Sequence, residues 1–278
     1  DKAGRFKAKN DADAAIRDKA NLVLGTLLHE QGQYNRAITY QNRVRLDGPF
    51  SNRALLSAGW ANMSAGRPNK ALVSWDVLAK RDATDRATQE AMLALPYAYG
   101  QLDLHKQAAA HYSRALNAYT LQFDKLSWSI RSIEDGRFLD ALSRDEIRED
   151  EDWVVRLRAL PDAPETYYLL ELLASNDFQT GLDNYLDLLD LRRRLSDWPA
   201  RVTVHGEFVA ADALDSLSGR IEETIDRVES LMTRQGRLLE KMATDELTAR
   251  LRRLDVYASK ARFGLADSRD RVQREARQ

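Results

Sequence analysis

The sequence lacks cysteine entirely and has no strong excess of either charge. Without cysteine the chain forms no disulfide scaffold, iron–sulfur cluster or thiolate zinc site, and it offers no cysteine nucleophile. No apolar run approaches about 18 residues, so we expect no direct membrane insertion by this segment. Lysine and arginine together number 42, against 43 aspartate and glutamate residues. This balance argues against a dedicated nucleic-acid binder, whose domain is usually basic.

Groupings that could perform catalysis are also scarce. The chain has 4 histidines, and no two stand at the i,i+4 spacing that binds zinc on one helix face. The Walker-type phosphate loop, the G-x-G-x-x-G dinucleotide loop and the G-x-S-x-G nucleophile turn are absent from the sequence. We therefore expect a protein that is not an enzyme and that needs no cofactor and no metal.

What the sequence does contain is an internal repeat with a period of about 34 residues. The first copy has small and aliphatic residues at Gly25, Gly32, Ala37, Ile38 and Val44. They recur in the second copy as Gly59, Gly66, Ala71, Leu72 and Leu78. A third copy follows at a slightly longer spacing, with Ala108, Tyr112 and Ala115. The period and residue types resemble the tetratricopeptide repeat (TPR), a helix–turn–helix unit.

The repeat has a physical explanation of its own. Gly32 and Gly66 stand where a helix must stop, because glycine tolerates left-handed backbone angles. Small residues allow the two helices of a unit to approach closely, and Trp75 and Tyr112 are expected to fill the remaining space. A single unit cannot bury its own apolar face, so several must stack into a solenoid. Pro96 lies within a predicted helix and is expected to kink it.

These patterns predict an all-α protein, a TPR-like α-solenoid followed by a long helical hairpin or coiled coil. The expected array covers 11–142, with three clear repeats and a degenerate fourth. An acidic connection over 143–164 and an additional TPR-like helix pair over 165–195 would follow. An irregular joint over 196–212 would then lead into the coiled-coil helices of 213–275.

The coiled-coil expectation rests on two heptad series of apolar residues. The first runs from Leu214 through Ile221, Val228, Leu231 and Leu238 to Met242, and the second runs from Leu247 to Val272. The phase jumps by about five residues between them, which fits either a hairpin turn or a distortion within one continuous helix. We favour the antiparallel hairpin. Pairing with a second copy or with another protein's helix is the rival interpretation.

The TPR resemblance also implies a binding surface. In that family the first helices of successive repeats line a groove that binds a peptide or helix. By position, the resemblance makes Lys19, Leu22, Ser64 and Glu90 groove-facing. The residues that we select for partner binding are Thr26, His29, Arg53, Leu56, Trp60, Met63, Leu93 and Tyr97. Trp60 and Tyr97 could equally be covered by the protein's own helices.

The expected function is that of a non-enzymatic adaptor or scaffold in a multiprotein assembly, binding a partner helix or extended peptide. A permanent structural subunit of a larger complex is the first alternative, and an accessory module of an enzyme or ligand-binding protein is the second. The chain opens on Asp1 with polar residues, so we expect a signal peptide, an anchor or further protein upstream. Together with bacterial-type composition, this favours a periplasmic or membrane-tethered location over a cytoplasmic one.

Overall fold

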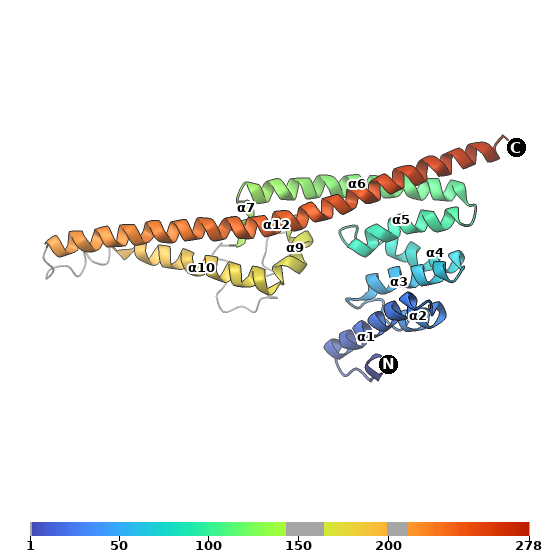
Figure 1. Cartoon of the computed structure of the whole chain (residues 1–278), viewed down its shortest axis with the longest axis horizontal. Helices are drawn as coiled ribbons and strands as arrows, with labels where there is room; N and C mark the ends of the chain where they lie inside the picture. Colours follow the sequence, from blue (N-terminus) through green and yellow to red (C-terminus); the bar gives the residue numbers. More distant parts are fainter. Residues whose placement is uncertain (1, 143–163, 199–210, 278) are drawn as a thin grey trace. The chain divides into compact units, whose positions relative to one another are not determined.

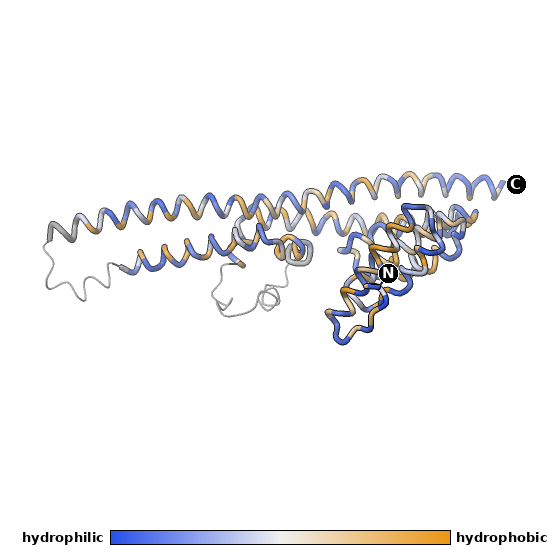
Figure 2. The backbone as a smooth tube through the Cα atoms, turned by 60° about the horizontal axis from the view of Figure 1, so that its bottom comes forward, coloured by the Kyte–Doolittle hydropathy of each residue, from blue (hydrophilic) through white to orange (hydrophobic). Residues whose placement is uncertain are grey.

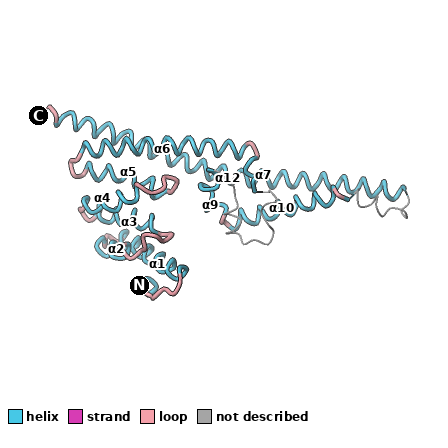
Figure 3. Tube along the Cα trace, turned by 180° about the vertical axis from the view of Figure 1, so that it is seen from behind, coloured by secondary structure: helices cyan, strands magenta, loops and turns pink. Residues whose placement is uncertain are grey.

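A computed structural model describes residues 2–142, 164–198 and 211–277. Every regular element in these ranges is helical, which confirms the all-α prediction (Figure 3). Most of the expected acidic connection and irregular joint lies outside the described residues. The chain forms two compact units: one comprises 1–124 with 252–278, and the other comprises 125–251. Within the described residues, no helix is both long and apolar enough to span a bilayer.

The first unit begins with a short 3-10 helix, Lys2–Gly4, and continues with α-helices that pack in sequence order (Figure 1). These helices are α1 (Asp11–Glu30), α2 (Tyr34–Gln41), α3 (Ser51–Ser64), α4 (Pro68–Ala79) and α5 (Arg86–Gly100). Each packs on the next, and α3 also contacts both α1 and α5. The first helices of the three expected repeats are therefore direct neighbours.

The turns within these helix pairs form as the glycine positions predict. Gly32 has φ 73° and Gly66 has φ 70°, both in the left-handed region. Their N–H groups donate to the carbonyl oxygens of His29 and Met63, each at 2.9 Å. These bonds satisfy carbonyls that the ends of α1 and α3 would otherwise leave unpaired.

A close approach of α3 and α4 depends on Gly59. The indole of Trp75 lies directly over this glycine, and a Cβ atom there would stand 2.1 Å from the indole Nε1. Trp75 is fully buried in a cluster that includes Ala87 and Ala91 of α5. It thus joins the helix pair α3–α4 to the first helix of the next pair, as the sequence predicts.

The expected fourth repeat has no separate first helix. Helix α6 (His105–Glu134) runs unbroken through the second helix of the third repeat and the expected first helix of the fourth. No glycine or proline interrupts this stretch, so nothing ends the helix near Tyr119. Tyr112, predicted to be core, is buried against Gly264, which belongs to the C-terminal helix rather than to a following repeat.

The second unit contains the C-terminal part of α6 and four further segments. These are α7 (Arg137–Leu142), α9 (Pro164–Leu173), α10 (Asn176–Ser196) and the first part of α12 (Ala211–Glu275). Helices α10 and α12 run antiparallel, because Gly181 adjoins Leu239 while Arg192 pairs with Glu229 at 2.8 Å. Gln235 Nε2 donates to the Gly181 carbonyl at 3.1 Å.

The predicted hairpin within 213–275 is wrong, because α12 is one helix of 65 residues. Apolar and polar residues are interspersed along much of this helix (Figure 2). The helix continues without a turn across the jump in heptad phase. Leu239, Ala243 and Leu247 follow one another at intervals of four residues there, and all three are buried. The antiparallel partner of its first part is α10, and its second part packs on α6, where Tyr257 lies 6.1 Å from Tyr119.

The first heptad series is also partly out of register. Leu231 and Leu238, predicted to lie in the helix seam, are 51% and 49% exposed. Their neighbours Met232 and Leu239 are buried instead. Leu231 is followed directly by Met232, and Leu238 by Leu239, so the apolar pattern alone allows either residue of each pair to lie in the buried seam. The second series is correct: Leu247, Leu254, Ala261 and Ser268 are buried.

Adding one methyl group at Gly59 should destabilise the first unit. We expect Gly59→Ala to lower the free energy of unfolding by about 1–3 kcal/mol, because the new Cβ displaces the Trp75 indole. Gly100→Ala is the matched control, since nothing lies within 4 Å of a Cβ at that helical position. Denaturant unfolding of the two variants measures the difference, and equal midpoints would show that the close approach is not needed.

Candidate partner-binding surface

The first helices α1, α3 and α5 are linked by two side-chain hydrogen bonds. His29 Nε2 lies 3.0 Å from Ser64 Oγ and joins α1 to α3. Trp60 Nε1 donates to Glu90 Oε1 at 2.9 Å and joins α3 to α5. Two of the selected residues, His29 and Trp60, thus form contacts between neighbouring first helices.

Trp60 is half-buried and contacts both of the neighbouring helices α4 and α5. Its ring centroid lies 4.9 Å from that of Trp75, in an edge-to-face arrangement that aromatic pairs favour. Leu56 and Met63, also half-buried, pack against the same core cluster. These three selected side chains are therefore partly occupied by contacts within the chain.

The remaining selected residues are more accessible. Thr26 and Arg53 are exposed, and Tyr97 is 45% exposed although the helix around it is buried. Leu93, one turn before Tyr97, is half-buried. These side chains place a hydroxyl, a guanidinium and a phenol on helices that contact one another. Such a mixture suits binding to a protein surface, where arginine and aromatic residues contribute most of the energy.

One groove-facing assignment from the resemblance is wrong. Leu22 is only 5% exposed and packs with Val44 and Ala54 in the core. The neighbouring residue Val23 is 50% exposed in its place. Contacts of α1 with α2 and α3 decide which face of α1 is buried. The pattern of residues within α1 alone does not specify these contacts.

A polar hollow of about 470 Å³ lies in the second unit. Its lining includes Tyr185 of α10 and Glu240 of α12. Burial raises the pKa of both groups, and the nearby Asp140 carboxylate raises them further. Arg237, which also lines the hollow, opposes the shift at Glu240. Among the described residues no cluster of three or more metal-ligating side chains is found.

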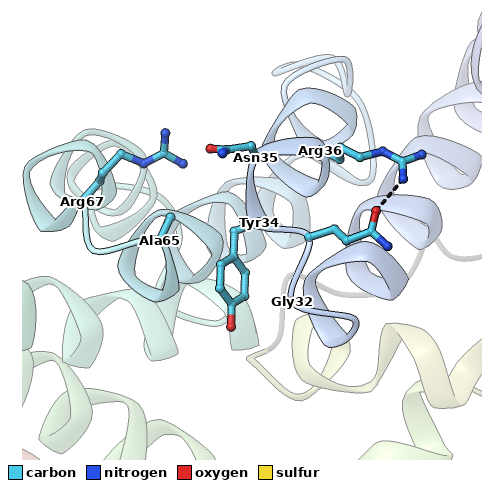
Figure 4. Close-up of a pocket in the computed structure, with 7 residues that line it drawn as sticks. Gly32, Tyr34, Asn35, Arg36, Ala65 and Arg67 are labelled. Carbon is cyan, nitrogen blue, oxygen red and sulfur yellow. Dashed lines mark hydrogen bonds between the residues drawn. The ribbon is translucent and has the colours of Figure 1, made fainter.

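A further cavity lies beside the turns of the first two helix pairs, and none of the predicted partner-binding residues lines it (Figure 4). Asn35, Arg36 and Arg67 line it. Arg67 stands about 34 residues after Gln33, at the equivalent repeat position. A single exchange of a neutral residue for a cation does not distinguish a site from an ordinary surface position, so the sequence alone could not find this cavity.

Comparisons with known proteins supply no relative. No protein family matches the chain, and neither a curated protein nor a solved structure is similar to it.

The Trp60–Glu90 bond should contribute measurably to the α3–α5 contact. We expect Trp60→Phe, which keeps an aromatic ring against Trp75 but removes the indole N–H, to lower the free energy of unfolding by about 1–2 kcal/mol. Glu90→Gln is the matched control, because its amide oxygen can still accept the bond. Denaturant unfolding gives both values, and a larger loss for Glu90→Gln would contradict the assignment.

Proposed function

We propose that this protein is a non-enzymatic adaptor or scaffold of the TPR type, binding a helix or extended peptide of another protein. The observation that carries the proposal is the direct contact of α1, α3 and α5, with Thr26, Arg53 and Tyr97 accessible on these helices. A peptide lying across the three helices would meet a polar group and an aromatic side chain without any rearrangement of the core.

The hydrogen bonds between these helices support such a role. His29–Ser64 and Trp60–Glu90 hold neighbouring helices in one register. A binding surface that is already ordered loses little conformational entropy when a partner binds. Tyr97 would act as the principal anchor, because a tyrosine buries a large area at a small entropic cost.

Removing accessible groups from this surface should weaken partner binding without unfolding the chain. We expect Arg53→Ala with Tyr97→Ala to reduce the partner captured from native cells about tenfold or more, as truncation of interface anchors commonly does. The matched control is Lys70→Ala with Val73→Ala on α4, which removes a cation and an apolar side chain from exposed positions. Quantitative mass spectrometry measures the captured proteins, and equal yields from the two double variants would contradict the proposal.

Pairing with a second copy of this chain is the second candidate, and an exposed stripe on α12 favours it. Leu217, Leu231 and Leu238 repeat at heptad spacing and are at least one-third exposed. Apolar side chains at this spacing on one helix match the seam of a coiled coil. We propose that a second copy of this chain covers the stripe.

The oligomeric state tests this second candidate. We expect the full chain to sediment as a dimer and Leu231→Lys with Leu238→Lys to sediment as a monomer, because charges in the seam prevent close packing. Val256→Lys with Phe263→Lys is the matched control: these residues share the heptad spacing, are 50% and 77% exposed, and lie beyond the stripe in the part of α12 that belongs to the first unit. A monomeric wild-type chain, or dissociation of both variants alike, would contradict pairing through the stripe.

A further inference from the structure

A cavity of about 450 Å³ opens between the turn after α1 and the turn after α3. It is lined by Gly32, Gln33, Tyr34, Asn35, Arg36, Ala65 and Arg67. None of these lining residues is acidic, and two of them carry a guanidinium. The cavity therefore has a net positive lining in a chain whose formal net charge is only −1.

Arg67 is the residue that points to a ligand. Its Nε and Nη2 atoms are buried, and neither has a hydrogen-bond partner among the described residues. In Figure 4 its guanidinium and the Asn35 amide point toward one another across the cavity. Arginine stays protonated at any physiological pH, so it cannot avoid the cost of buried, unpaired donors by losing its charge.

The two unpaired nitrogens lie on the same edge of the guanidinium group. The Nε–H and one Nη2–H bond point in parallel, and this edge binds two oxygens of an oxyanion at once. A single water molecule can accept from both donors, but it leaves the positive charge unneutralised. A bidentate oxyanion satisfies both and neutralises the charge, so it fits this edge better than water does.

The N-terminus of α2 adds a second source of positive potential to the cavity. Within the described part of the chain, no side chain caps this helix. The side chain of Gln33, at the N-cap position, instead donates to Gln31 and accepts from Arg36. The first N–H groups of α2 belong to Tyr34, Asn35 and Arg36, which line the cavity. The N-terminus of a helix favours anions such as phosphate, sulfate or a carboxylate.

We propose that this cavity binds a phosphate group, either as inorganic phosphate or as a phosphomonoester. Arg67 would hold two phosphate oxygens through Nε and Nη2, and the N-terminus of α2 would face a third. Arg36 remains bonded to Gln33 and its guanidinium points away from Arg67 in Figure 4, so it would contribute through its charge rather than through a direct bond. A doubly charged phosphate matches two guanidinium groups and a helix terminus more closely than a singly charged carboxylate does.

Thermal unfolding of the full chain with added potassium phosphate tests the proposal, using potassium chloride at equal ionic strength as reference. We expect phosphate to raise the midpoint above the chloride value, because a ligand that binds only the folded state stabilises it. O-phosphoserine forms a second arm: a larger shift than with phosphate identifies a phosphomonoester as the preferred source. No shift with either compound would overturn the proposal.

Arg67→Met is the decisive variant, because the proposal predicts that it weakens phosphate binding without lowering stability in chloride. It should abolish the phosphate shift, with the apparent Kd raised about tenfold or more. It should also leave the midpoint in chloride unchanged or higher, because it removes buried donors that have no partner. Arg53→Met, which removes an exposed guanidinium from α3, should keep the full phosphate shift.

A second variant keeps the test decisive if Arg67→Met does not fold. Arg36→Gln removes the other charge of the cavity, and it should weaken the phosphate response while chloride stability is retained. Responses of Arg36→Gln and Arg67→Met equal to that of Arg53→Met would overturn the site.

Discussion

A close contact between an aromatic side chain and a glycine brings two pairs of helices together in the first unit, and the packing of that unit depends on it. Trp75 covers Gly59 between α3 and α4, and Tyr112 covers Gly264 between α6 and α12. An aromatic ring over a glycine buries much apolar area while it keeps the helix axes close. Helices α2, α3 and α4 have only 8, 14 and 12 residues, and isolated helices of such lengths are marginal in water, so these contacts supply stability that a single helix lacks.

Buried polar groups also fix the packing of the first unit. Asp18 is fully buried, and its Oδ2 accepts a hydrogen bond from Arg45 Nε at 2.8 Å. Asn21, also buried, donates from Nδ2 to the Gly4 carbonyl at 2.9 Å. Bonds of this kind select one register for η1, α1 and α2, since a shifted packing would leave buried polar atoms unpaired. A surface built on α1, α3 and α5 is therefore held in one arrangement.

Part of the candidate site could be predicted from repeat positions. The repeat pattern placed Thr26, Arg53 and Tyr97 on first helices, and the structure leaves all three accessible. It could not show that Trp60 is shared between Trp75 and Glu90, because that contact joins residues of three helices. The pattern also gave no sign of the Arg67 cavity. An arginine in a turn looks like an ordinary surface cation until its surroundings are known.

The amino-acid sequence by itself determined that the chain is helical and where several helices end. Gly32 and Gly66 can adopt left-handed angles because glycine has no Cβ atom, and this local property is legible in the sequence. Only the tertiary structure decided which face of α12 is buried and which helix it pairs with. Leu231 next to Met232 and Leu238 next to Leu239 offer two apolar stripes of nearly equal hydrophobicity. Contacts with Gly181 and Leu139 select one stripe, because burial depends on partners far away in the chain.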